Sequence, residues 1–371
     1  MRYNWELPDW PFFRYDTKVL EPLLYQFVLE TGEISGLLKS LPEQVKQESL
    51  LEIMLLEAVK TSEIEGEFLS RQDIMSSIRN NLGLNQIPEN VRDRKSQGIG
   101  ALMVDVRKTY REPLTRATLM RWHEMVLAAA VHIQAGQWRS GSEPMQIISG
   151  TIGKETVHFQ APPSTQVPFE MERFIKWFNE TGPGGENPLI SGPVRAAIAH
   201  LYFESIHPFA DGNGRIGRAI AEKALSQTLD RPLMLSLSRT IEADKKSYYA
   251  ALELAQKSNE ITEWIGYFAD VVLNAQIESR QLIDFSLRKA QFFDKNGKLL
   301  NDRHLKVIKK IFEAGKDGFE GGMSAKKYMS ITKTSKATAT RDLQFLVQNG
   351  IFTPAGAGRS VRYNLIFDNS I

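Results

Sequence analysis

The densest run of glycine and charged residues in the protein reads His207-Pro208-Phe209-Ala210-Asp211-Gly212-Asn213-Gly214-Arg215-Ile216-Gly217-Arg218. Helical patterns flank it, and the preceding one has apolar residues at Val194, Ala197, Ile198, Leu201 and Tyr202. Gly212 and Gly214 permit turn and left-handed conformations, which would aim successive backbone N–H groups into a concavity where the next helix begins. Because the start of a helix also attracts anions, the segment predicts a phosphate-binding loop between two helices.

The charged side chains of this segment suit chemistry on a phosphate. Arg215 and Arg218 are three residues apart, so they lie on neighbouring turns and can both bond phosphate oxygens. Asp211 supplies a hard carboxylate oxygen for Mg²⁺, which commonly combines one or two carboxylates with substrate phosphates. His207 can accept a proton near neutral pH. The alternative for His207 is a loop histidine with no chemical role.

The segment matches His-Pro-Phe-x-Asp-Gly-Asn-Gly-Arg-x-x-Arg at every fixed position, so the protein resembles the Fic family of nucleotidyl transferases. Flanking features agree over about residues 50–275, including Gly136-Gln137-Trp138-Arg139 and the segment from Thr156 to Pro163. The resemblance implies a mainly α fold, a helical bundle with a small β-hairpin flap. The alternating pattern from Met145 to His158, interrupted by Gly150 and Gly153, also predicts a strand pair.

The resemblance implies a protein adenylyltransferase, which moves AMP from ATP to a Tyr, Thr or Ser hydroxyl of a target protein. His207 would take the hydroxyl proton, Asp211 would hold Mg²⁺, and Arg215 and Arg218 would hold the β/γ end of ATP. Tyr249 would stack on adenine, with packing in the core as its alternative. The implied nucleotide-binding set is Glu65, Gly212, Asn213, Gly214, Arg215, Ile216, Gly217, Arg218 and Tyr249. The flap would hold the target as an added strand.

A second segment, Thr61-Ser62-Glu63-Ile64-Glu65-Gly66, resembles the inhibitory helix of that family. If Glu65 pairs with Arg218, the arginine cannot hold the γ-phosphate, and ATP would bind with its α-phosphate misaligned. The resting enzyme is therefore expected to be autoinhibited. Taken alone, Glu65 could equally be a solvated carboxylate at a helix end.

Other functions on the same scaffold stay open. The enzyme could remove AMP, with Glu65 positioning a water, or transfer another phosphate-containing group. It could instead be a transcription regulator whose Fic domain senses nucleotide. We expect no structural metal, since the protein has no cysteine and its other histidines lack ligand spacing. Structural roles are expected for His123, His132, His158, His200 and His304.

The charge changes sign along the chain. The net charge is +2 overall, but residues 295–371 carry 14 basic and 6 acidic side chains. Helical patterns over 304–314, 324–329 and 335–350, followed by two strand-like stretches, resemble a winged helix-turn-helix domain. DNA is the expected partner, and protein docking is the alternative. The contact candidates are Lys333, Lys336, Arg341, Arg359 and Arg362.

The length of 371 residues allows two or three domains. We divide the sequence into an N-terminal helical region with the inhibitory helix (1–110), a Fic catalytic domain (111–280) and a winged helix-turn-helix domain (295–371). No apolar run is long enough to span a bilayer and no signal layout opens the sequence, so a cytoplasmic protein without a membrane partner is expected. A second copy of the chain is a further candidate partner.

Overall fold

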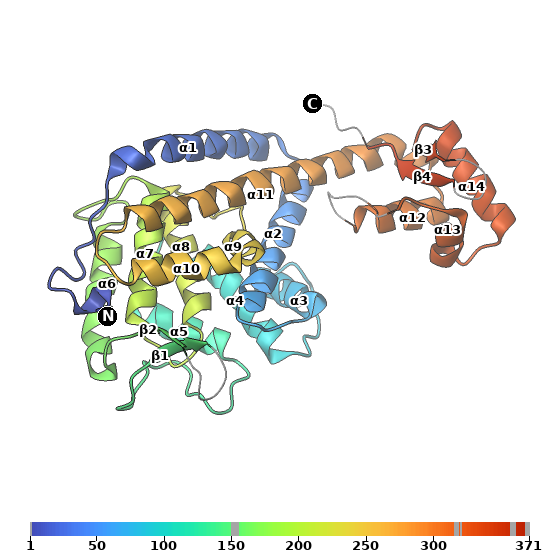
Figure 1. Cartoon of the computed structure of the whole chain (residues 1–371). Helices are drawn as coiled ribbons and strands as arrows, with labels where there is room; N and C mark the ends of the chain where they lie inside the picture. The colour runs from blue at the N-terminus through green and yellow to red at the C-terminus, as the bar shows by residue number, and fades with distance from the viewer. Residues whose placement is uncertain (1, 150–155, 315–318, 320, 357–360, 368–371) are drawn as a thin grey trace. The chain divides into compact units, whose positions relative to one another are not determined.

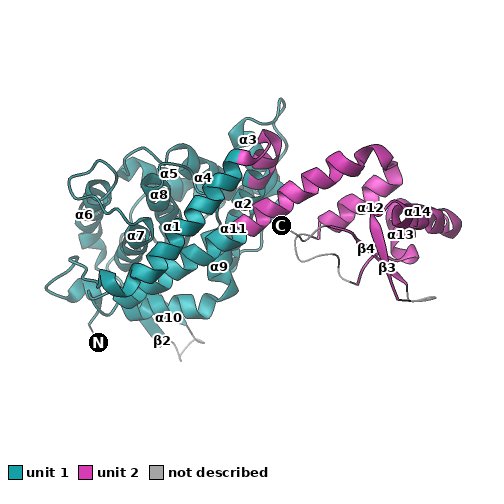
Figure 2. Cartoon of the chain, turned by 90° about the horizontal axis from the view of Figure 1, so that it is seen from above, with its two compact units in different colours: residues 1–39, 50–279 teal, residues 40–49, 280–371 magenta. Residues whose placement is uncertain are grey.

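The computed structural model describes residues 2–149, 156–314, 319, 321–356 and 361–367. It is mainly helical, with two small antiparallel strand pairs, and so confirms the predicted fold class of a helical bundle with a small flap (Figure 1). Two compact units make up the chain (Figure 2). Unit 1 comprises Met1–Lys39 and Leu50–Ser279, and unit 2 comprises Ser40–Ser49 and Arg280–Ile371. None of the described helices is long and apolar enough to cross a bilayer.

The elements up to residue 296 are mostly α-helices. In chain order they are η1 (Asn4–Glu6), α1 (Thr17–Ser40), α2 (Glu43–Ile64), α3 (Arg71–Leu82), α4 (Arg94–Lys108), α5 (Arg116–Val126), β1 (Gln146–Ser149), β2 (Thr156–Gln160), η2 (Ser164–Gln166), α6 (Val167–Glu180), α7 (Gly192–Ile206), α8 (Asn213–Thr228), α9 (Leu237–Ala243), α10 (Lys245–Ala255) and α11 (Thr262–Asn296). The residues between the predicted second and third domains, 281–294, belong to α11.

Helices α7 and α8 pack against each other in the centre of unit 1 (Figure 1). Every residue of α7 is buried, as expected for a helix that is apolar on all sides rather than on one face. Pro193 lies in its first turn, where a missing N–H costs nothing. The two central helices therefore form a rigid support for the loop that joins them, residues 207–212.

The predicted flap is an antiparallel pair of β1 and β2. Ile147 pairs with Phe159 and Ile148 pairs with Val157, so His158 is an extra residue on β2. Such a bulge turns a side chain out of the regular alternation. The glycines predicted at the flap tip, Gly150 and Gly153, lie outside the described residues.

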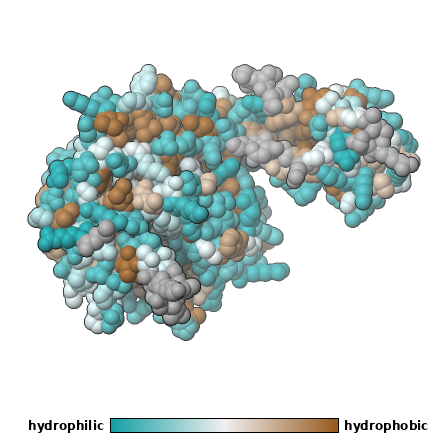
Figure 3. Space-filling view, in the orientation of Figure 1, coloured by the Kyte–Doolittle hydropathy of each residue, from teal (hydrophilic) through white to brown (hydrophobic). Residues whose placement is uncertain are grey.

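One face of α1 presents apolar side chains to solvent (Figure 3). The exposed residues are Val19, Tyr25, Val28 and Leu29. Leu20, Phe27 and Ile34 of the same helix are buried. The helix is therefore apolar on more than its core-facing side.

Unit 2 contains the three helices and two strands expected near the C-terminus. They are α12 (Asp302–Phe312), α13 (Ala325–Thr332), α14 (Lys336–Gln348), β3 (Phe352–Ala355) and β4 (Arg362–Leu365), with a short η3 (Gly297–Leu299) before them. Ser335, the first residue of the predicted pattern over 335–350, caps α14, because its side chain accepts the Thr338 N–H. Pro354, which as a turn-type residue could have ended the strand, and Ala355 extend β3 and pair with Tyr363 and Arg362.

The core of unit 2 surrounds a buried carboxylate, Asp342. Arg303 Nε donates to it at 2.7 Å and the Tyr328 hydroxyl donates at 2.9 Å. The predicted contact residues Lys333, Lys336, Arg341 and Arg362 are exposed, and Arg359 lies outside the described residues.

Candidate functional site

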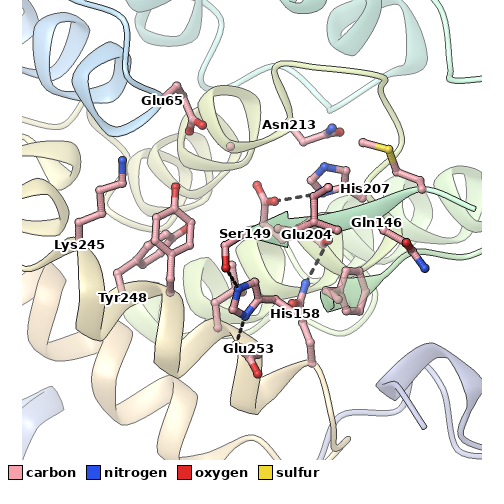
Figure 4. Close-up of a pocket in the computed structure, with 18 of the residues that line it drawn as sticks. Glu65, Gln146, Ser149, His158, Glu204, His207, Asn213, Lys245, Tyr248 and Glu253 are labelled. Carbon is pink, nitrogen blue, oxygen red and sulfur yellow. Dashed lines mark hydrogen bonds and ion pairs between the residues drawn. The ribbon is translucent and has the colours of Figure 1, made fainter. Parts of the chain in front are cut away.

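A cavity of about 810 Å³ opens in unit 1 between the flap, the loop before α8, and α10 (Figure 4). Its wall brings together most of the predicted site residues with several that the sequence did not single out. The lining residues used below are Glu65, Ser149, His158, Glu204, His207, Asp211, Gly212, Asn213, Gly214, Arg218, Lys245, Tyr248, Tyr249 and Glu253.

The loop between α7 and α8 has a fixed shape. His207 ends α7 in a left-handed conformation (φ 48°), which is uncommon for a residue with a side chain. Phe209 is fully buried and stacks on the His123 ring at 4.0 Å. Asn213 bridges the loop, because its Oδ1 accepts the Phe209 N–H at 2.9 Å and its Nδ2 donates to the Phe209 carbonyl at 2.8 Å. Its side chain thus supports the loop, and its backbone N–H is left for a ligand at the helix start.

Arg139 holds the same loop from outside. Its Nε donates to the His207 carbonyl at 2.7 Å, and its backbone N–H donates to the Pro208 carbonyl at 2.9 Å. A further guanidinium nitrogen donates to the Pro162 carbonyl at 2.5 Å, which joins the loop to the base of the flap. Burial lowers the pKa of Arg139 to about 10. The contacts of Arg139 are those of a residue that supports the loop.

A buried glutamate lies behind His207. Glu204 is 3% exposed and precedes His207 by one turn, and its Oε2 lies 3.5 Å from His207 Nδ1 (Figure 4). Burial alone would raise the pKa of Glu204, but the contact with His207 and the nearby positive groups outweigh it, so this pKa is lowered. Sequence reasoning missed Glu204, although a carboxylate three residues before a histidine on a helix is a usable signal.

Gly217 and Ile216 have contacts that describe structural roles, and their assignment to nucleotide binding stays a prediction. A Cβ on Gly217 would come within 2.3 Å of Glu204 Oε1 and 3.2 Å of His200, so the glycine lets α7 approach closely. The Ile216 side chain is fully buried in the core. Neither residue is among the described residues that line the cavity.

Asp211 has the exposure and chemistry of a magnesium ligand. Half of its side chain is exposed, and it faces the cavity. Its Oδ1 accepts the Gly212 N–H at 2.5 Å, which fixes the carboxylate at the start of α8. No cluster of three or more metal-binding side chains occurs among the described residues. A single carboxylate fits Mg²⁺ when substrate phosphates and water provide the other ligands.

Glu65 and Arg218 form the ion pair expected from the sequence. Arg218 is 2% exposed, and its NH2 donates to Glu65 Oε1 at 2.7 Å. Two further donations, to Thr61 Oγ1 at 2.8 Å and to the Thr61 carbonyl at 3.0 Å, attach it to the end of α2. Burial works against the charge of Arg218, but Glu65 outweighs it and the pKa of Arg218 is raised.

Two glycines make this contact possible. A Cβ on Gly214 would come within 2.4 Å of Glu65 Oε1, so any side chain there would push the carboxylate away. Gly66 follows Glu65 in a left-handed conformation (φ 78°) and ends the helical turn. Lys245 donates to the carbonyl of Ile64, the last residue of α2, and so attaches this helix end to α10.

Arg215 is not among the described residues that line the cavity, and its contact with the phosphates stays a prediction. Its NH1 donates to Glu67 Oε2 at 2.7 Å, and Lys95 binds the other oxygen of Glu67 at 2.6 Å. Arg215 NH2 lies 3.5 Å from Asp211 Oδ1. The segment after α2 therefore provides one carboxylate for each of the two arginines, Glu65 for Arg218 and Glu67 for Arg215. Only the pair of Glu65 and Arg218 was predicted from the sequence.

Two adjacent tyrosines of α10, Tyr248 and Tyr249, differ in their exposure. Tyr248 is 1% exposed, and its hydroxyl lies 2.7 Å from His200 Nε2. Tyr249 is 40% exposed at the cavity wall, with the Lys245 ammonium 5.7 Å from its ring centre. Tyr249 is thus the ring that is accessible for stacking. His158, expected to be structural, lies in the cavity wall as well.

Comparisons with known proteins find similarity to the Fic family. The model of the Fic/DOC family matches residues 113–225, and that of a domain of unknown function, DUF4172, matches residues 3–84. A protein adenylyltransferase Fic of Culex quinquefasciatus is 27% identical over 158 residues, which is 42% of this chain and 27% of that protein. Protein adenylyltransferase fic-1 of Caenorhabditis elegans is 29% identical over 139 residues, 37% of this chain and 23% of that protein. The matches span about a quarter of these relatives' length.

Solved structures show the same fold. A Fic family protein from Desulfovibrio desulfuricans G20 has a TM-score of 0.52 at 21% identity, covering 94% of this chain and 98% of its own. A Fic domain signalling protein from Bacteroides thetaiotaomicron has a TM-score of 0.52 at 18% identity, covering 72% of this chain and 97% of its own. The motif, the fold and the family match agree, and the protein carries a domain of the Fic/DOC family.

Proposed function

We propose that the protein is an autoinhibited protein adenylyltransferase that moves AMP from ATP to hydroxyl side chains of target proteins. The observation that carries the proposal is the position of His207, Asp211 and Arg218 on one cavity wall, around the start of α8. A base, a magnesium ligand and a phosphate-binding cation are the groups that phosphoryl-type transfer requires.

The residues have distinct tasks in this reaction. His207 accepts the proton of the target hydroxyl as that oxygen attacks the α-phosphorus of ATP, and pyrophosphate leaves. Glu204 orients the imidazole from behind. The backbone N–H groups of Gly212, Asn213 and Gly214 stabilise charge on the phosphates. Mg²⁺ held by Asp211 would neutralise charge on the same phosphates. Tyr249 stacks on the adenine, and the flap binds the target segment as an added strand.

The contacts of Arg218 support the proposed autoinhibition. Its guanidinium already has three donations to Thr61 and Glu65, and ATP must displace Glu65 before the γ-phosphate can bind there. A nucleotide that cannot use Arg218 loses the alignment of its α-phosphate, and small misalignments cost large factors in rate.

The test compares wild type, Glu65→Gly and Glu65→Gly/His207→Ala, each incubated with Mg²⁺ and α-labelled ATP, with and without a cell lysate. We expect weak labelling of protein by wild type, strong labelling by Glu65→Gly, and none by the double variant. Omission of Mg²⁺ should abolish the signal. If none of the proteins labels although ATP binds, AMP transfer is wrong, and AMP removal or nucleotide sensing takes its place.

For unit 2 we propose DNA binding through a winged helix-turn-helix module. The exposed face of α14 carries Lys336 and Arg341, and β4 carries the exposed Arg362. The buried Asp342 is neutralised by Arg303, so it does not oppose an anionic partner on this helix. A helix with exposed basic residues beside a strand pair that carries an arginine is an arrangement that such modules present to DNA.

A further inference from the structure

A serine, a histidine and a glutamate form a line of hydrogen bonds in the cavity wall, separate from the His207 loop (Figure 4). Ser149 Oγ, at the end of β1, lies 2.6 Å from His158 Nε2 on β2. His158 Nδ1 lies 2.8 Å from Glu253 Oε2 on α10. We call these residues the Ser149–His158–Glu253 cluster. The proposed function does not use it.

The direction of these hydrogen bonds follows from the chemistry of the groups. An ionised carboxylate only accepts, so His158 Nδ1 carries the hydrogen and donates it to Glu253. The pKa of Glu253 is lowered, first by the hydrogen bond from Lys257 and then by that from His158, which keeps the carboxylate ionised. In the neutral imidazole Nε2 is then an acceptor, and the Ser149 hydroxyl donates to it. A hydroxyl facing a base that a carboxylate orients is the arrangement of an activated serine nucleophile.

The flap has a local irregularity that places this base. His158 is the extra residue of the bulge on β2, since its neighbours Phe159 and Val157 pair with consecutive residues of β1. Bulges of this kind occur near functional sites, where they redirect one side chain. Thr156, the cross-strand partner of Ser149, also has a hydroxyl on the flap, but it is not among the described residues that line the cavity.

We propose that Ser149 is an acceptor of AMP, so that the protein modifies its own flap. The proposal rests on the proposed function, because ATP bound beside His207 provides the electrophile, and Ser149 lines the same cavity. The Ser149 hydroxyl gives its proton to His158 Nε2, and Oγ bonds to the α-phosphorus of ATP. The bond from that phosphorus to the bridging oxygen breaks, and its electron pair leaves with pyrophosphate.

The modification would have a consequence for target proteins. An AMP group on Ser149 would occupy the cavity and the end of β1, where the flap is proposed to bind a target strand. Self-modification and target modification would therefore compete for the same space.

The test uses the full-length protein in the Glu65→Gly background, incubated with Mg²⁺ and ATP. Three further variants are compared in it: Ser149→Ala, His158→Gln and, as the matched control, Thr156→Val. Mass spectrometry of peptides locates AMP on the protein, and α-labelled ATP measures transfer to lysate proteins. Thermal midpoints check that each variant is folded.

We expect AMP on Ser149 in the Glu65→Gly protein and in its Thr156→Val form, and none at this position in Ser149→Ala. His158→Gln should slow the modification of Ser149 by about 100-fold, as expected for loss of a general base. If lysate proteins or other residues are labelled and Ser149 is not, the proposal is wrong and the proposed function stands. An undiminished rate in His158→Gln, or an equal loss in Thr156→Val, would also overturn it. Absence of AMP on every protein would overturn both.

Discussion

At the scale of single residues, the site contains a buried carboxylate, that of Glu204, which was not predicted from the sequence. Glu204 is buried between α7 and α8, where only the glycine at 217 leaves room for its Oε1. A buried charge is costly unless a partner compensates it, and His207 is the residue its Oε2 faces. We therefore regard Glu204 as a positioning residue for the base.

The first prediction concerns Glu204→Gln in the Glu65→Gly background. The amide keeps the shape of the side chain but removes the charge that orients His207, so AMP transfer should fall about 10-fold to 100-fold. Initial rates of label incorporation measure this. Glu172→Gln, an exposed position on α6, is the control and should leave the rate unchanged.

Glu204→Gln should also change how the free energy of unfolding depends on pH. The pKa of Glu204 is lowered in the folded protein from the ordinary value of 4.5, so its contribution to stability is complete above pH 4.5 and is lost as the pH falls below it. Glutamine does not titrate. The difference in free energy of unfolding between wild type and Glu204→Gln should therefore narrow from pH 6 towards about pH 3, as measured by denaturant unfolding. A difference that is constant with pH would contradict this assignment.

At the scale of elements, the end of α2 is the part that contacts Arg218 and that we propose to regulate it. Three attachments hold it: Thr61 and Glu65 to Arg218, Glu67 to Arg215, and Lys245 to the last carbonyl of the helix. The left-handed Gly66 lies between the two glutamates and allows both to reach their arginines.

The second prediction is that Gly66→Ala activates the enzyme. An added Cβ meets no atom within 4 Å, so the cost arises from the φ of 78° alone and amounts to about 1 kcal/mol. Gly83→Ala is a matched control, because Gly83 ends α3 with a φ of 73° and equally open space. Both variants should lose similar stability, but only Gly66→Ala should label protein more strongly than wild type. Equal labelling by the two would show that general loosening, not release of Glu65, is responsible.

The features that depend on short stretches of sequence could be predicted from the sequence. The loop from His207 to Asn213, the flap strands and the cap at Ser335 follow from spacing, turn residues and capping chemistry over short distances. The ion pair of Glu65 and Arg218 was predicted from the resemblance of residues 61–66 to the inhibitory helix of the Fic family. Glu67 escaped notice because its partner Arg215 is 148 residues away, and nothing local marks the pair.

The positions of the other site residues could be found only from the tertiary structure. His158 lies in the cavity wall at a bulge of β2, and Glu253 contacts it from α10. Regular alternation cannot predict such a bulge. Arg215 and Arg218 look equivalent in sequence, yet one pairs with Glu67 outside the cavity and the other faces into it.

At the scale of the whole molecule, charge is divided between the parts of the chain. Residues 295–371 have a net charge of +8, and the remaining residues have a net charge of −6. Polyanions release counterions on binding to clustered basic side chains, so such binding weakens as salt increases. The basic C-terminal part and the catalytic unit thus suit different classes of partner.

The third prediction tests DNA binding by the full-length protein. Lys336→Ala/Arg341→Ala should weaken retention of duplex DNA and lower the slope of affinity against salt by about 2. Lys309→Ala/Lys310→Ala, two exposed lysines on α12, removes the same charge and is the control. Fluorescence anisotropy over a series of salt concentrations measures both. An equal effect of the two double variants would indicate general charge attraction rather than binding through α14.

In the proposed autoinhibition, the nucleotide and the end of α2 compete for the guanidinium of the buried Arg218, which pairs with the partly exposed Glu65. A partner that captures the end of α2 in its released position would raise the affinity for ATP, and by thermodynamic reciprocity ATP would raise the affinity for that partner by the same factor. The nucleotide level of the cell would then determine how often α2 is available for recognition. The binding of that partner would then depend on the ATP concentration even before any AMP is transferred.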